Sequence, residues 1–145
     1  MLPSKLLING AFVEGAMQLD VVNPATGKAF ATVARADAGQ LEEAVAAAKA
    51  AGPGWAALGC AVRGEYLTKL ADAIEANKDE FAKLLTAEQG KPRAEARGEV
   101  AYAASFIEWF AEEGKRVYGD TIPTVANDKR LLVLKEPIGV AAAIT

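Results

Sequence analysis

The run GVAAAIT at residues 139–145 constrains the fold more than any other stretch of the sequence. It follows a Pro-Ile-Gly turn at 137–139, and Val140 to Ile144 contains only apolar residues. A short apolar run after a turn is typical of a strand buried on both faces of a parallel sheet. Such a strand needs strands beside it and helices above and below it. The sequence therefore predicts the first strand of an incomplete α/β unit at residues 137–145.

The N-terminal region predicts antiparallel β structure. In residues 6–15 the pair Asn9-Gly10 separates two short apolar runs, which is the strongest local signal for a β-hairpin. A second unit has apolar runs at 19–22 and 29–33, joined by NPATGK at 23–28. Asn-Pro opens this turn and Gly27 can adopt a positive φ. We expect two hairpins in a small β layer.

From Asp37 onward the apolar residues recur with a helical period. Four helices are expected: one capped by Asp37 and ended by GPG at 52–54, one at about 61–76, one beginning with a capping box at Asn77 and Glu80 and stopped by Gly90, and one from Pro92 to about Gly114. The last helix carries Tyr102, Phe106, Trp109 and Phe110 on more than one face. This pattern is typical of a helix buried between layers.

After the helices, GDTIP at 119–123 is expected to turn the chain and Leu131 to Leu134 to form a strand. Hairpins, then helices, then strands predict an α+β fold that begins an α/β unit. The expected division is a region at 1–136, with hairpins and helices, and the first strand of a second domain at 137–145. The sequence shows no internal repeat and no linker.

Composition excludes several classes of site. There is no histidine and only one cysteine, so neither a Ser-His-Asp triad nor an intrachain disulfide can form. A net charge of -3 gives no electrostatic reason to expect nucleic acid or an anionic membrane as a partner. No apolar run is long enough to span a bilayer, and the N-terminus lacks a secretory signal. A cytoplasmic protein is expected.

Few residues are candidates for chemistry. Glu88, Glu95 and Glu99 could act as general acids or bases, but solvated or ion-paired helix residues are the simpler interpretation. Cys60 is expected to be a small buried apolar residue rather than a reactive thiolate. The aromatic group on the long helix could line an apolar pocket, or it could belong to a packed core or a subunit contact. No metal site is expected.

Read in order, the motifs resemble the N-terminal third of an aldehyde dehydrogenase. The resemblance covers INGAFVEG at 8–15, NPATGK at 23–28, EQGKP at 88–92, EARGEV at 95–100 and EPIGVAAAIT at 136–145. The segment 103–123 is most similar to the succinate-semialdehyde dehydrogenases. This family oxidises aldehydes to acids with NAD or NADP. The resemblance implies that the full-length protein acts on an aldehyde and assembles as a homo-oligomer.

The resemblance also implies roles for particular residues. Ile144 and Thr145 correspond to the rim of the cofactor site, and Tyr102, Phe106 and Trp109 to a helix beside the aldehyde tunnel. The catalytic cysteine, the general base and most of the cofactor site match no residue of this chain, and Cys60 lies in the wrong segment to be the nucleophile. We expect no catalytic residue here, and no cofactor bound by this chain alone.

Two functions remain open from the sequence. The first is the N-terminal segment of an NAD(P)-dependent aldehyde dehydrogenase, most simply one for succinic semialdehyde or a related aldehyde. The second is an autonomous, non-enzymatic α+β module that associates with itself or binds a partner. An autonomous module would be expected to protect its last strand with charge or proline, and residues 139–145 contain neither. This favours the first function.

Overall fold

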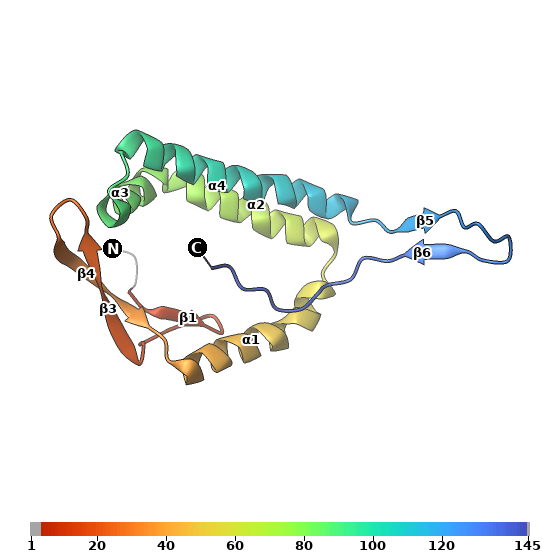
Figure 1. Ribbon diagram of the computed structural model, residues 1–145, viewed down its shortest axis with the longest axis horizontal. Helices are drawn as coiled ribbons and strands as arrows, with labels where there is room; N and C mark the ends of the chain where they lie inside the picture. Colours follow the sequence, from red (N-terminus) through yellow and green to blue (C-terminus); the bar gives the residue numbers. More distant parts are fainter. Residues whose placement is uncertain (1–3, 145) are drawn as a thin grey trace.

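The computed structural model describes residues 4–144 as hairpins, a helical layer and an extended arm (Figure 1). The elements in chain order are β1 (Leu6–Ile8), β2 (Ala11–Val13), β3 (Met17–Asn23), β4 (Lys28–Arg35), α1 (Ala38–Ala56), α2 (Cys60–Ala76), α3 (Lys78–Gln89), α4 (Arg93–Glu113), the 3₁₀ helix η1 (Gly114–Arg116), β5 (Asp120–Ile122) and β6 (Leu131–Val133). The strands pair as three antiparallel ribbons, β1–β2, β3–β4 and β5–β6. The predicted α+β architecture is confirmed.

Both predicted hairpins form at the expected turns. Asn9 and Gly10 have φ values of 50° and 77°, so both central residues of the first turn adopt the left-handed conformation that a tight hairpin requires. In the second turn the Asn23 side chain accepts a hydrogen bond from the Ala25 amide at 2.9 Å, and Gly27 has a φ of 66°. Local turn chemistry thus determines both connections.

Helix α1 begins at the predicted cap, where Gln40 also joins the helix to the hairpins. The Asp37 carboxylate accepts a hydrogen bond from the backbone N–H of Gln40 at 2.8 Å, and the Gln40 side chain accepts one from the backbone N–H of Asp37, so the two residues form a capping box. The Gln40 carboxamide then bridges to the β2–β3 linker. Its Nε2 donates to the Glu14 carbonyl at 2.8 Å, and its Oε1 accepts from the Ala16 amide at 2.9 Å. One side chain therefore ties the start of α1 to the linker between the two hairpins.

We expect Gln40→Met to destabilise the protein by about 1–2 kcal/mol, since it removes the hydrogen bonds to the linker and half of the capping box. The free energy of unfolding from urea titrations would measure the loss. Glu42→Met is a matched control, because Glu42 is exposed on the same helix. Equal stability of the two variants would show that the Gln40 bridge contributes nothing.

The predicted end of α1 at 52–54 is wrong, because the helix continues through Pro53 to Ala56. Its last turn is held from outside the helix. The Arg63 guanidinium donates hydrogen bonds to the backbone carbonyls of Ala56 and Leu58 at 3.1 and 2.5 Å. The ring centroids of Trp55 and Tyr66 lie 5.5 Å apart. Contacts with α2 thus stabilise a turn that proline would otherwise weaken.

Helices α2, α3 and α4 pack together as one layer, with a core of small side chains. The buried apolar residues are Ala71, Ala82, Ala96, Val100, Ala104 and Ala111. Gly64 is also buried, and a Cβ built on it would lie 3.0 Å from the Ala111 carbonyl oxygen. Alanine and glycine at the crossing allow the backbones of α2 and α4 to approach closely.

The predicted capping box at the start of α3 does not form. Asn77 donates its side-chain amide back to the Ala73 carbonyl at 2.8 Å, and Glu80 pairs with Lys83 at 2.6 Å. Asn77 follows α2 directly, so its side chain caps the end of that helix instead of the start of the next. The predicted stop at Gly90 is confirmed, with a φ of 74° and a hydrogen bond from its amide to the Thr86 carbonyl.

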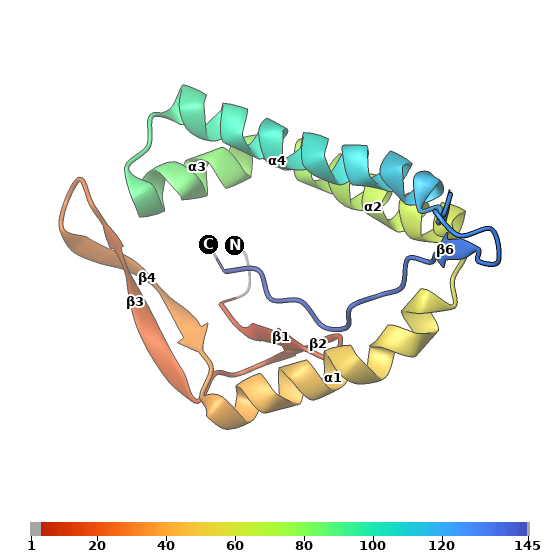
Figure 2. The same ribbon diagram turned by 45° about the vertical axis from the view of Figure 1, so that its right-hand side comes forward.

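The C-terminal region differs most from the prediction. Asp120 to Ile122, expected to be a turn, pairs with Leu131 to Val133 in an arm that projects beyond the helices (Figure 1). The segment 137–144 forms no strand and runs back between α1 and the helical layer (Figure 2). A strand requires a partner backbone, and none of the described residues pairs with this segment. Val140 is 47% exposed.

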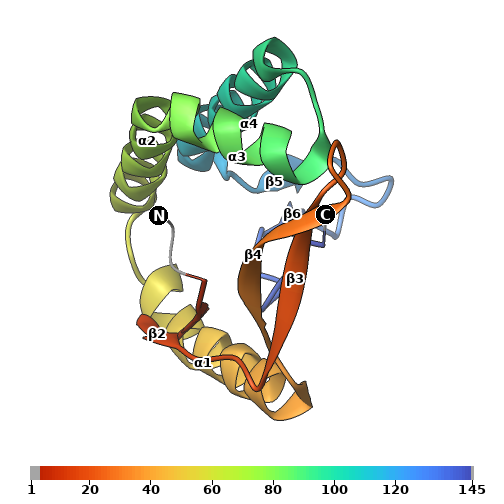
Figure 3. The ribbon, with the colours of Figure 1, turned by 90° about the vertical axis from the view of Figure 1, so that its left-hand side faces the viewer.

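The chain forms an open frame rather than a closed globule. Figure 3 shows α2, α3 and α4 on one side and α1 with β2 on the other, with the β3–β4 hairpin spanning between them. At the hairpin tip, Pro24 meets the α3–α4 corner, where a Cβ built on Gly90 would lie 3.0 Å from the Pro24 Cγ. Helix α1 has no buried residue, and its apolar stripe, which includes Leu41 and Val45, is exposed.

Candidate functional site

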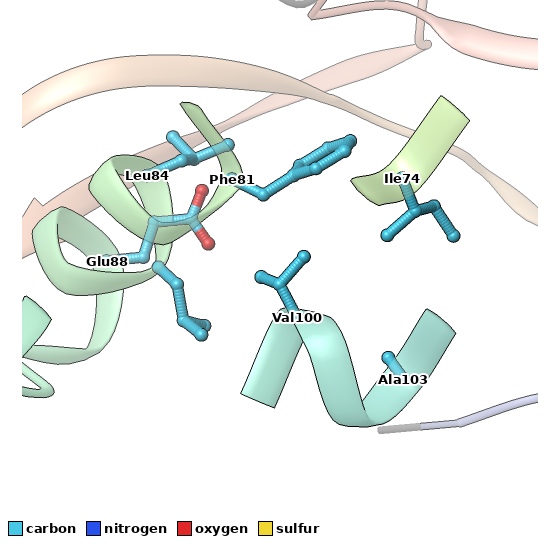
Figure 4. Close-up of a pocket in the computed structure, with 7 residues that line it drawn as sticks. Ile74, Phe81, Leu84, Glu88, Val100 and Ala103 are labelled. Carbon is cyan, nitrogen blue, oxygen red and sulfur yellow. The ribbon is translucent and has the colours of Figure 1, made fainter. Parts of the chain in front are cut away.

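An apolar hollow of about 300 Å³ opens between the three packed helices (Figure 4). Its lining residues are Ile74 of α2, Phe81, Leu84, Leu85 and Glu88 of α3, and Val100 and Ala103 of α4. Three apolar side chains project from the same side of α3, because they are spaced at i, i+3 and i+4: Phe81, Leu84 and Leu85. Such spacing marks an apolar side of a helix, but it carries no signal that this side borders a hollow.

Glu88 is the one carboxylate on the wall of this hollow. It lies one turn beyond Leu84 on α3, and its carboxylate points to the same side as Phe81 and Val100 (Figure 4). The lining contains no cation that would pair with it. A general acid or base needs a reacting group within hydrogen-bond reach, and the other lining side chains are all apolar. The geometry therefore gives Glu88 a place in the hollow but no partner for catalysis.

The two other candidate glutamates do not join Glu88. Glu99 forms an ion pair with Lys91, which spans the first two turns of α4. Arg97, which lies between Glu95 and Glu99 in the sequence, donates to the Asp79 carboxylate at 2.8 Å. These exposed pairs tie α4 to α3 and to the corner before it. The simpler interpretation, ion-paired surface residues, is confirmed for Glu99.

Three charged groups at exposed helix positions have shifted pKa values. Hydrogen bonds from Lys83 and Lys115 lower the pKa of Glu80 and of Glu112, respectively. The hydrogen bond to Glu113 raises the pKa of Arg116. All three pairs join residues three apart on a helix surface, where solvent screens their charges. None of them lines the hollow.

The aromatic residues of α4 form an exposed row on the side of the helix away from its buried alanines. Tyr102 is 65% exposed, Phe106 48% and Trp109 64%, and Phe110 extends the row. The Tyr102 and Phe106 rings meet edge to face, with centroids 4.8 Å apart. Within the described residues this row is not buried between layers, because Ala96, Val100, Ala104 and Ala111 occupy the packed side of the helix instead.

Of the two residues expected at the cofactor site, the structure describes Ile144 alone. Ile144 is 93% exposed at the end of the unpaired segment. Thr145 lies outside the described residues. No glycine-rich loop between a strand and a helix borders Ile144 within residues 4–144, so no cradle for a pyrophosphate is present there. The residues described do not fit a dinucleotide by themselves.

Three further features of the described residues bear on the site. Cys60 is exposed at the first position of α2, not buried as expected: it lies on the same side of the helix as the buried Gly64 and Ala71, but at the helix end, one turn before Gly64. Among the residues described, no group of three or more histidine, cysteine, aspartate or glutamate side chains could hold a metal ion. No helix in that same part of the chain is both long enough and apolar enough to cross a membrane.

Known proteins resemble this chain over nearly its whole length. A glutarate-semialdehyde dehydrogenase of Pseudomonas putida is 51% identical over 95% of the chain, and a succinate-semialdehyde dehydrogenase of Escherichia coli, whose name specifies NADP(+), is 50% identical over 96%. The crystal structure of succinate-semialdehyde dehydrogenase from Burkholderia pseudomallei matches 91% of the chain with a TM-score of 0.84 and 49% identity.

These relatives are much longer than the chain. It spans 29% of each of the two sequences and 28% of the crystallised protein. The matching structure has the same arrangement of elements, so the open frame is a part of the fold of those enzymes. The model of the aldehyde dehydrogenase family matches residues 12–145. The chain therefore belongs to the aldehyde dehydrogenase family.

Proposed function

We propose that this chain is the N-terminal segment of an NAD(P)-dependent aldehyde dehydrogenase that oxidises a short semialdehyde, such as succinic or glutaric semialdehyde, to its acid. The observation that carries the proposal is the agreement with semialdehyde dehydrogenases at about half of all positions over nearly the whole chain. The nucleophile, the general base and most of the cofactor site are proposed to lie outside these 145 residues. The proposal includes a cytoplasmic location and a homo-oligomeric assembly.

Within this proposal, α4 supplies one wall of the aldehyde tunnel. Tyr102, Phe106 and Trp109 are large, apolar and exposed, and they follow each other on one side of a rigid helix. Such a wall suits the methylene groups of a semialdehyde. It carries no cation, so the substrate's carboxylate would be bound by residues outside this chain. Ile144 and Thr145 are proposed to reach the rim of the NAD(P) site when the segment 139–145 pairs with a neighbouring strand.

A chimera tests the proposed function. Residues 12–145 would replace the matching segment of the Escherichia coli succinate-semialdehyde dehydrogenase, which keeps the rest of that enzyme intact. We expect the chimera to reduce NADP(+) with succinic semialdehyde at a kcat within about tenfold of the parent, because half of the exchanged residues are identical. NADPH absorbance would follow the reaction. A chimera that folds and assembles like the parent but has no turnover would overturn the proposal and favour a binding module.

The tunnel wall has its own test in the same chimera. We expect Trp109→Ala to raise the KM for succinic semialdehyde about tenfold and to change kcat much less, because lost apolar contact costs about 1–3 kcal/mol of binding and Trp109 carries no reacting group. Phe12→Ala is a matched control, since it removes a comparably exposed aromatic side chain from β2. Equal KM values for the two variants would show that Trp109 does not line the aldehyde tunnel, and would leave the proposed reaction unchanged.

A further inference from the structure

We draw no further inference here: the strongest candidate, the apolar hollow between α2, α3 and α4 with Glu88 on its wall, carries nothing because no described part of the structure shows what covers it.

Discussion

Gly90→Ala is expected to lower the free energy of unfolding by about 2 kcal/mol, from two separate causes. Gly90 has a φ of 74°, and holding an alanine in the left-handed region costs about 1 kcal/mol. The new Cβ would also lie 3.0 Å from the Pro24 Cγ, so the hairpin tip would have to move away from the α3–α4 corner. Urea denaturation followed by circular dichroism would measure the sum.

The chain offers a substitution that separates these causes. Pro24→Ala removes the Cγ and keeps the Cβ, which lies 3.9 Å from the point that the new Cβ of residue 90 would occupy and is therefore in ordinary contact. In the Pro24→Ala background, Gly90→Ala should cost only the conformational part, about 1 kcal/mol. If Gly90→Ala lowers the free energy of unfolding equally in both backgrounds, Pro24 at the hairpin tip does not contact the α3–α4 corner.

Gly64→Ala is expected to destabilise the protein by about 1–3 kcal/mol, although alanine is the better helix former. Gly64 is buried where α2 packs on α4, and its new Cβ would meet the Ala111 carbonyl oxygen at 3.0 Å. That oxygen belongs to the backbone of α4 and cannot rotate away, so the two helices must separate. The same denaturation measurement applies, and Gly64→Leu should prevent the helical layer from packing.

Gly98 provides a control of opposite sign. It lies in the interior of α4, is exposed, and has no atom within 4 Å of the position a Cβ would take. Gly98→Ala should therefore raise the free energy of unfolding by about 0.5–1 kcal/mol, because alanine loses less conformational entropy in a helix. If both alanine substitutions stabilise the protein, the close approach of α2 and α4 at Gly64 is not present in solution.

The elements that could be predicted from the sequence depend on chemistry within a few residues. Asn9-Gly10 and Gly27 form their turns because few residues tolerate positive φ values, and Asp37 and Gly90 mark helix ends because they satisfy the backbone groups there. The family resemblance similarly followed from the order of short motifs. The turns and these two helix ends were confirmed because neighbouring residues alone decide them.

The helix and strand boundaries that were predicted wrongly each depend on a residue in another element. That residue binds the boundary segment in place of the local partner that the sequence suggested. Arg63 and Tyr66 hold the turn that follows Pro53, so α1 does not end at the proline. Asn77 could cap either α2 or α3, and the Ala73 carbonyl of α2 binds its side chain. The strand at 120–122 exists because 131–133 pairs with it. Local patterns cannot rank such alternatives.

By itself the sequence determined the hairpins, the four helices, the lack of a histidine-based site and the membership of a family, because these depend on residue types and their order. Only the tertiary structure decided that alanines, not aromatics, form the packed side of α4, and that Pro24 meets Gly90 across the frame. Helical periodicity shows that a helix has an apolar side, but which of two apolar sides is buried depends on the shape of the helices it packs against.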